Sequence, residues 1–180
     1  MKSTRRFFLT MSIGALPLLA GCGIFGNQVN MELTDEDKQR CPPVGIVSYT
    51  GEITNFASGD GRTTNDVVSR GSISELRVNC FNTATGVDTT VSFDVSASTG
   101  PAGVGQNVRF SYFVALTDSE GTILEKKLYA ASVPTTGGYG TTRQFVGIQV
   151  PFEDDEYLVD QEVVIGFDLS REQLTYNVQR

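Results

Sequence analysis

An alternation of side-chain polarity between positions 87 and 97 constrains the fold of this chain more than any other feature of its sequence. One set of positions holds Val87, Thr89, Val91, Phe93, Val95 and Ala97, and the positions between them hold Asp88, Thr90, Ser92, Asp94 and Ser96. Successive side chains of a β-strand point to opposite faces of the sheet, so this pattern predicts a strand with one buried and one solvated face. A chain built from such strands has to bury their apolar faces against another layer of structure.

The same period of two recurs along most of the chain after Cys41. Strands are predicted at Val44–Val47, Val67–Cys80, Val87–Ala97, Val108–Leu116, Thr122–Val133, Gln144–Val150 and Val163–Leu169. Turns at Thr83–Gly86 and Asp118–Gly121 separate two pairs of strands, which is typical of β-hairpins. We therefore expect an all-β domain over residues 41–180, an immunoglobulin- or fibronectin-like antiparallel β-sandwich of about seven strands, with a small barrel as the alternative.

A short helix is predicted at the C-terminal end of this domain. Ser170 and Gln173 have the spacing of a capping box, in which each side chain bonds to the backbone N–H of the other residue. The helix is expected to end near Asn177 and to close one end of the sandwich through Leu174.

The first 21 residues have the composition of an export signal. Lys2, Arg5 and Arg6 form a basic start without acids, and a mostly apolar stretch, Phe7–Leu19, follows. This stretch is too short and too interrupted for a transmembrane helix, which needs roughly 20 apolar residues. The paired arginines also resemble a twin-arginine signal, so this route and ordinary secretion both stay open.

Leu19-Ala20-Gly21-Cys22 resembles a lipobox, in which a cysteine thiol receives a lipid and signal peptidase II cleaves before it. We predict a lipoprotein signal peptide over residues 1–21, with Leu19, Ala20 and Gly21 recognised by the peptidase and Cys22 lipidated. Two or three acyl chains anchor a protein stably, since each buried CH₂ contributes about 0.8 kcal/mol. An ordinary secretory signal with an incidental cysteine is the alternative. Gly23, where aspartate would favour the inner membrane, favours the outer membrane facing the periplasm.

Residues 22–40 are predicted to be a flexible tether, which as a coil spans roughly 20–25 Å. Once Cys22 carries lipid, Cys41 and Cys80 remain, and in an oxidising compartment we expect them to form a disulfide. The bond would close a loop of about 40 residues and contribute roughly 4 kcal/mol to stability. Two buried free thiols are the alternative.

Charge and composition exclude several classes of function. The formal net charge is −7, and loss of a leader with three basic residues and no acid lowers it to −10. A protein this acidic, without a polybasic patch, is a poor candidate for binding nucleic acid. The sequence has no histidine, which removes Ser-His-Asp and Cys-His catalysis and the commonest ligand of zinc, copper and haem. We expect no cofactor and no enzymatic activity.

A few features have residue types that bind ligands, and each also has a simpler explanation. Glu153–Glu156 could hold Ca²⁺, but it lacks the spaced pattern of a calcium loop, so a solvated acidic loop is the better interpretation. The same holds for Asp35–Asp37 and Gly59–Arg62. Tyr139, between two glycines, could stack on a sugar or simply lie at a mobile loop tip. Gly100–Gly105 lacks the Gly-Lys-Ser/Thr ending of a phosphate loop.

Three carboxylates, Glu52, Glu75 and Asp94, are candidates for acid–base chemistry. A hydrolase that uses carboxylates alone needs two of them facing each other in a cleft, roughly 5–9.5 Å apart. Nothing in the sequence brings any two of the three together.

Short motifs spread over most of the mature chain resemble a family of envelope lipoproteins found chiefly in alphaproteobacteria. The similar pieces are Leu19–Cys22, Cys41–Val44, Ile46–Val47, Gly61–Arg62, Thr64–Val67, Tyr112–Ala115, Gly166–Leu169 and Glu172–Asn177. The resemblance implies a lipid-anchored protein with a β-rich domain. It implies no activity, because the family has none assigned, and it supplies no catalytic residues.

The function predicted from these observations is that of a non-catalytic interaction module, an adaptor or scaffold that binds another envelope protein. β-Sandwiches bind through loops and free strand edges, and the candidate loops are Thr54–Asn65, Ser98–Gly105 and Pro134–Thr142. The alternative is a periplasmic receptor that binds a soluble ligand or Ca²⁺ through the acidic loop or the Tyr139 loop.

Overall fold

The computed structural model describes residues 41–59, 61–105, 107–151 and 161–180 of the 180-residue chain. Most of the described chain is in β-strands. In chain order the elements are β1 (Val44–Ile46), β2 (Glu52–Phe56), β3 (Val67–Asn82), β4 (Gly86–Thr99), β5 (Asn107–Thr117), β6 (Ile123–Pro134), β7 (Tyr139–Pro151), β8 (Glu162–Phe167) and α2 (Arg171–Gln179). Two single 3₁₀ turns, Thr64–Asp66 and Thr136–Gly138, lie in the connections.

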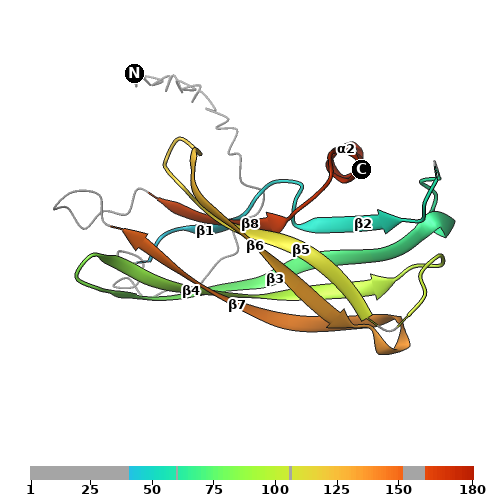
Figure 1. The fold of residues 1–180 in the computed structure, drawn as a ribbon, viewed down its shortest axis with the longest axis horizontal. Coiled ribbons are helices and arrows are strands. Elements are labelled where there is room, and N and C mark those ends of the chain that lie inside the picture. The colour runs from blue at the N-terminus through green and yellow to red at the C-terminus, as the bar shows by residue number, and fades with distance from the viewer. Residues whose placement is uncertain (1–40, 60, 106, 152–160) are drawn as a thin grey trace, which may run out of the picture.

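The strands form two four-stranded sheets that pack face to face (Figure 1). One sheet has the order β1-β8-β5-β6 and the other the order β2-β3-β4-β7. Neighbouring strands are antiparallel except β1 and β8, which run parallel with Val44 opposite Val163. The predicted all-β sandwich with a short C-terminal helix is therefore confirmed, with eight strands in the described part of the chain instead of about seven.

The core lies between the sheets and is built from the alternating faces of β4 and β5. On β4, Val91, Phe93 and Val95 have no exposed surface, as the alternation predicts. Phe93 meets Tyr112 of β5 edge to face, with ring centroids 5.3 Å apart. Phe167 of β8, also without exposed surface, packs against the ring of a second β5 aromatic residue at 5.2 Å. Such aromatic pairs contribute about 0.5–1.5 kcal/mol beyond their buried area.

The strand that the sequence did not predict is β2, which includes the first three residues of the expected loop Thr54–Asn65. It pairs with the first half of β3, with Ile53 opposite Gly71, and Ile53 is 6% exposed against the core. The loop that follows is correspondingly shorter and begins after Phe56. At the other border, β7 already begins at Tyr139, so the expected loop Pro134–Thr142 is reduced to residues 135–138.

The turns and the cap fall where they were predicted. The β5–β6 turn contains Gly121 with φ +82°, the left-handed conformation that glycine adopts without strain. At the start of α2, Gln173 donates its backbone N–H to Ser170 Oγ at 3.2 Å. The Gln173 side chain accepts the Ser170 N–H at 2.8 Å and completes the capping box.

The predicted disulfide joins Cys41 to Cys80, with their Cα atoms 5.6 Å apart. It connects the segment before β1, in one sheet, to the end of β3, in the other sheet. We call this end of the sandwich, with the disulfide and the turns 83–85 and 118–122, the disulfide end. It lies at the left in Figure 1.

Candidate functional site

The three loops that were predicted as a binding surface lie together at the end of the sandwich opposite the disulfide. Residues 57–66, 100–105 and 135–138 connect the strands at the right in Figure 1, and we call them the loop end. Backbone bonds hold the second loop to the start of β3, directly after the first loop: Gly100 donates its N–H to Val68 O at 2.9 Å, and Ala102 donates to Val67 O at 2.9 Å. A hydroxyl bond of 3.2 Å joins Thr99, the last residue of β4, to Thr135 in the third loop. The fold thus gathers three separate segments into one surface.

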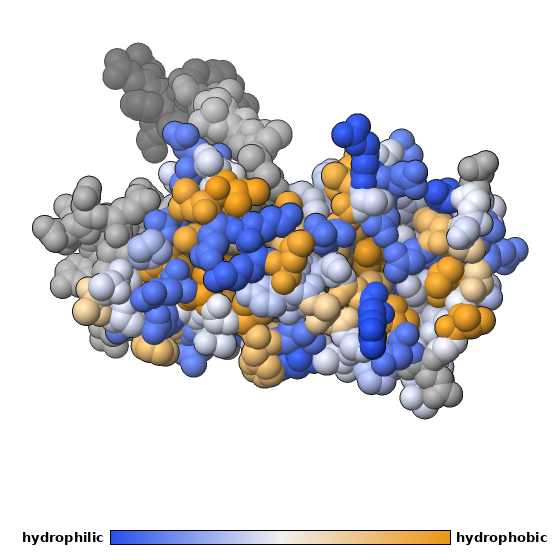
Figure 2. All heavy atoms as spheres, in the orientation of Figure 1, coloured by the Kyte–Doolittle hydropathy of each residue, from blue (hydrophilic) through white to orange (hydrophobic). Residues whose placement is uncertain are grey.

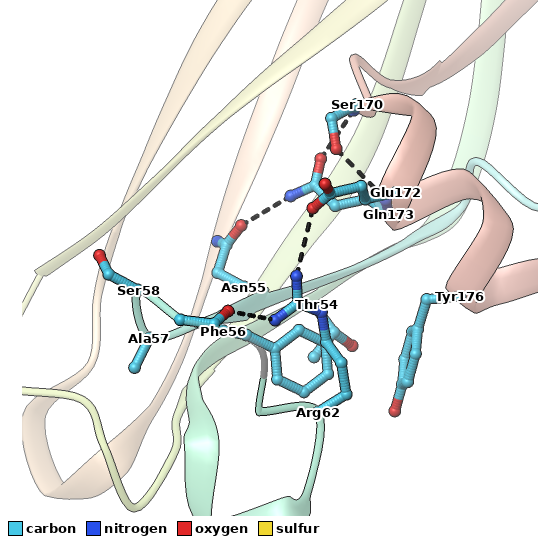
Figure 3. Close-up of a pocket in the computed structure, with 11 residues that line it drawn as sticks. Thr54, Asn55, Phe56, Ala57, Ser58, Arg62, Ser170, Glu172, Gln173 and Tyr176 are labelled. Atoms are coloured by element: carbon cyan, nitrogen blue, oxygen red, sulfur yellow. Dashed lines mark hydrogen bonds and ion pairs between the residues drawn. The ribbon is translucent and has the colours of Figure 1, made fainter.

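A pocket of about 380 Å³ opens beside this end, between the β2–β3 connection and the first turns of α2 (Figure 3). Its wall combines backbone and polar side chains with two aromatic rings. The lining residues are Thr54, Asn55, Phe56, Ala57, Ser58, Gly59, Arg62, Ser170, Glu172, Gln173 and Tyr176. The pocket is within the size range of small-ligand sites, about 300–1,000 Å³, although its wall is more polar than is usual for them.

Arg62 is the charged centre of this pocket, and its guanidinium is held from several directions. It donates to Gly59 O at 3.0 Å and to Gly61 O at 2.8 Å, and Nη2 lies 3.2 Å from a carboxylate oxygen of Glu172 on α2. The guanidinium carbon lies 5.2 Å above the ring of Phe56, within cation–π distance. The Arg62 side chain stays 41% exposed, so its guanidinium remains accessible from solvent.

The loop that carries Arg62 is shaped by a second carboxylate, Asp66. Thr63 donates to Asp66 Oδ2 through its hydroxyl at 2.6 Å and through its backbone N–H at 2.9 Å. These two hydrogen bonds to the charged form lower the pKa of Asp66 below its ordinary value. Gly61 faces the same carboxylate, and a Cβ at this position would come within 2.6 Å of it. The contacts of Asp66 with Thr63 and Gly61 therefore stabilise the loop conformation in which Arg62 lines the pocket.

Helix α2 is held against β2 mainly by polar contacts. Gln173 Nε2 donates to Asn55 Oδ1 at 2.9 Å, and Asn177 Nδ2 donates to the carbonyls of Tyr49 and Glu52 at 2.8 Å each. One aromatic contact adds to these, because the ring of Tyr176 meets Phe56 edge to face at 5.1 Å. The helix thus covers the flank of the sandwich next to β2.

The expectation that Leu174 closes one end of the sandwich is wrong. This side chain is 39% exposed, and α2 has no buried residue. The apolar contact to the sandwich is made by Tyr176 instead. A capping box fixes where a helix begins, but it carries no information on the surface that the helix will cover.

Tyr139 is the first residue of β7, and its side chain is 61% exposed. Its phenolic oxygen accepts a hydrogen bond from Thr141 Oγ1 at 3.2 Å, and this hydroxyl is itself 2.9 Å from Ser96 Oγ. Hydrogen bonds from Ser96 and Thr141 lower the pKa of Tyr139. The ring borders a shallow pocket of about 240 Å³ that also includes Arg70 and Arg180. Tyr139 therefore begins a strand and does not lie at the loop tip that the sequence had suggested.

The three candidate carboxylates are each paired with an arginine. Both Asp94 oxygens accept from Arg143, at 2.7 and 2.8 Å, and Glu75 lies 3.3 Å from Arg77. Glu52 pairs with Arg180 at the end of α2. Glu52 and Glu75 do border one pocket of about 560 Å³ between β1, β3 and α2, but Asp94 does not. Each of these two carboxylates is thus exposed and makes an ion pair with an arginine.

Several predicted sites fall outside the described residues. These are the lipobox Leu19–Cys22, the tether 22–40 and the acidic run Glu153–Glu156. Within the described part of the chain, no group of three or more His, Cys, Asp or Glu is placed to hold a metal ion. No helix in that part is long and apolar enough to span a membrane.

The pocket at α2 is the feature that the sequence did not reveal. Arg62 was noted within a polar Gly-Asp-Gly-Arg run and Gln173 as half of a capping box, and both lie in pieces of the family resemblance, but nothing connected the two residues. The two sides of the pocket are 110 residues apart along the chain at the Arg62–Glu172 contact. A single sequence contains no signal for a contact of this separation. Comparisons with protein-family models, with curated proteins and with solved structures gave no match.

Proposed function

We propose that the protein is a lipid-anchored lipoprotein of the cell envelope whose β-sandwich binds another envelope protein through its loop end. The observation that carries the proposal is the arrangement of the two ends. Cys41, where the chain enters the sandwich, lies at the disulfide end, and the three loops lie at the opposite end. A domain tethered by residues 22–40 to lipid on Cys22 would then present its loops away from its own anchor.

The chemistry of the loop end supports a protein partner that carries acidic side chains. Arg62 is exposed and already makes an ion pair with a carboxylate at 3.2 Å, which a partner's carboxylate can replace. Phe56 and Tyr176 beside it supply aromatic surface, the residue type that is enriched in protein interfaces. The neighbouring loops provide backbone groups for further hydrogen bonds.

Anchoring is tested with the variant Cys22→Ser in its native membranes. The parent chain is expected in the membrane fraction with an acylated N-terminal cysteine, detected by mass spectrometry of the N-terminal peptide. Cys22→Ser is expected to lose the lipid and to appear in the soluble envelope fraction. Cys22→Ser that stays acylated, or a parent chain that carries no lipid, would contradict the anchor.

The partner is tested by crosslinked capture from the same membranes. Two of the few lysines, Lys126 and Lys127, lie away from the loop end on β6, so a carboxylate-directed reagent is added to the lysine-directed one. A stoichiometric partner is expected with the parent chain and a reduced yield with Arg62→Glu. Arg77→Glu is a matched reversal of an exposed arginine on β3, outside the loop end, and should leave the yield unchanged. If the two variants behave alike, the loop end is not the binding surface.

The second candidate function is a receptor for a small polar ligand, which the pocket of about 380 Å³ at Arg62 favours. In this case the thermal midpoint of the purified chain rises with the ligand concentration, because a ligand that binds only the folded state stabilises it. A screen of Ca²⁺, glycans and small carboxylates measures this directly. A rise that Arg62→Ala abolishes would support the receptor function over the adaptor.

A further inference from the structure

Strand β6 has an unpaired edge along most of its length. Among the described strands it pairs only with β5, and it ends its sheet. At its C-terminal end β7 crosses over it, where Thr142 Oγ1 donates to Ser132 O at 3.3 Å. The backbone groups of residues 123–130 facing away from β5 are therefore the free part of this edge, and such an edge can template another strand.

The side chains on this free part are unusually apolar for an exposed strand. Ile123 is 59% exposed, Leu124 is 50% exposed and Leu128 is 61% exposed. Figure 2 shows apolar residues gathered beside the tip of the β5–β6 hairpin. No described element covers these three side chains, although burying each one would contribute about 1.5–3 kcal/mol.

The charged side chains on this free part of β6 are divided between the two faces of the sheet. Glu125 and Lys127 are opposite Leu116 and Val114 of β5, so they lie on the same face of the sheet, with Lys127 Nζ 2.6 Å from Glu125. Lys126 lies on the other face, where it contacts residues of its own chain. Its Nζ is 3.7 Å from Asp168 and 4.6 Å from the ring centre of Phe113.

We propose that two copies of this chain associate by antiparallel pairing of β6 with β6 about a twofold axis at Lys126, which joins two four-stranded sheets into one of eight strands. In this register Glu125 of each copy is opposite Lys127 of the other, and Leu124 is opposite Leu128. Opposite charges and apolar pairs at directly facing positions stabilise a sheet. The proposal does not depend on the function proposed above.

The register follows from the sequence of the strand. Facing residues must share a face of the sheet, so the two neighbouring twofold registers have their axis at residue 125 or at residue 127. They place Glu125 against Glu125 or Lys127 against Lys127. Like charges that face each other directly destabilise a pair of strands. The axis at Lys126 also uses nearly all of the free edge, since residues 123–129 are centred on this position. The two Lys126 side chains meet at the axis, but each is already held by Asp168 and Phe113 of its own copy.

The register is tested by cysteine crosslinking of the full chain in its native membranes. Lys126→Cys should form a disulfide-linked dimer under mild oxidation, because position 126 faces itself across the axis at a distance that a disulfide spans. Glu125→Cys alone should give no dimer above the parent chain, whereas membranes holding both Glu125→Cys and Lys127→Cys should. Dimer formation by Glu125→Cys alone, or none by Lys126→Cys, would overturn the proposed pairing.

The charge pairing is tested by swapping it, with the association constant measured by analytical ultracentrifugation of the purified chain. Glu125→Lys and Lys127→Glu should each weaken the dimer about tenfold or more, since each puts two like-charge contacts in place of two ion pairs. The double variant Glu125→Lys with Lys127→Glu should restore association. These side chains are exposed, so circular dichroism and the thermal midpoint should stay close to those of the parent. Lysines on an edge strand can also prevent pairing with another chain. A parent chain that is monomeric at every concentration would show that Lys126 and Lys127 have this role and would overturn the proposed dimer.

Discussion

Gly166 shows how a single residue sets the distance between a strand and its neighbouring connection. Thr50, in the turn between β1 and β2, lies directly over Gly166 of β8, and its hydroxyl donates to Val47 O at 2.8 Å. A Cβ at position 166 would overlap the Thr50 side chain and come within 2.9 Å of the Phe113 ring. The backbone N–H of Phe167 donates to Thr50 O at 2.8 Å, so this turn cannot move away without losing a bond.

Gly166→Ala is therefore expected to lower the free energy of unfolding by roughly 1–3 kcal/mol, the usual cost of overpacking a filled site. Chemical denaturation of the purified chain measures this difference. Gly147→Ala is the matched control, since Gly147 lies in β7 with no atom within 4 Å of an added Cβ. The control is expected to be neutral or stabilising by about 0.5 kcal/mol. Equal effects at both positions would contradict the close packing of Thr50 on Gly166.

The ion pair between Asp94 and Arg143 predicts one part of the dependence of stability on pH. Two hydrogen bonds from Arg143 lower the pKa of Asp94 below its ordinary value of 3.8. The pair then stabilises the folded state above the unfolded pKa of about 4, and this contribution is lost as the pH falls through the folded pKa.

Asp94→Asn is thus expected to be less stable than the parent at neutral pH, with a difference that shrinks as the pH falls below about 4. Thermal unfolding between neutral and acidic pH measures it. Asp88→Asn, on the same face of β4 opposite Gln149, is the control. A difference for Asp94→Asn that stays constant over the whole range would exclude the ion pair as its cause.

At the scale of elements, the sequence predicted best where a strand has a long one-sided apolar pattern. β4 was predicted almost to its ends, because its alternation extends over eleven residues with inward side chains that are almost all buried. β2 was missed because it has only five residues and one inward apolar side chain with deep burial, Ile53. The polar run after it carries stronger signals for a loop than Ile53 carries for a strand.

The sequence predicted the loops of the candidate site but not their assembly. Residues 57–66 and 135–138 were identified because glycine and polar residues interrupt the alternation there. The three loops lie at one end because of the order of the strands in the two sheets. The pocket at Arg62 forms because α2 packs beside β2. Periodicity reports which face of an element is buried, but it does not report what covers that face. For the same reason, the periodicity could not predict the parallel pairing of β1 with β8.

The short strand β1 depends on the disulfide more than any other strand does. It has three residues, none of them fully buried, and Cys41 joins its leading segment to β3. Replacing both cysteines by alanine is expected to lower the free energy of unfolding by roughly 4 kcal/mol on the loop-entropy estimate for a loop of 39 residues.

Urea denaturation of Cys41→Ala with Cys80→Ala checks this value, and hydrogen exchange at Val44–Ile46 should accelerate more than exchange at β4. The parent chain in a reducing agent is the control and should approach the double variant. Unchanged exchange in β1 would mean that its pairing with β8 holds it without the disulfide.

For the whole molecule, the separation of the two ends is the basis of the proposed orientation. Ser58 at the loop end and Thr85 at the disulfide end are both exposed, so a photoreactive side chain at either position leaves the fold intact. We expect the probe at Ser58 to crosslink to a protein and the probe at Thr85 to crosslink to lipid or to nothing. Gel electrophoresis of the irradiated membranes distinguishes these results. A protein adduct only at Thr85 would reverse the orientation.

The parallel pairing of β1 with β8 has a consequence for how the chain is made. Among the described strands β1 pairs only with β8 in its sheet, so this sheet stays incomplete until β8 has been made. Pairings between the two extremes of a chain are also the slowest to form, because the largest loop has to close first. During that interval β5 has one open side where β8 will lie, and a strand from a neighbouring chain can occupy it. Synthesis, which proceeds from the N-terminus, therefore leaves β5 exposed to mispairing until β8 has been made.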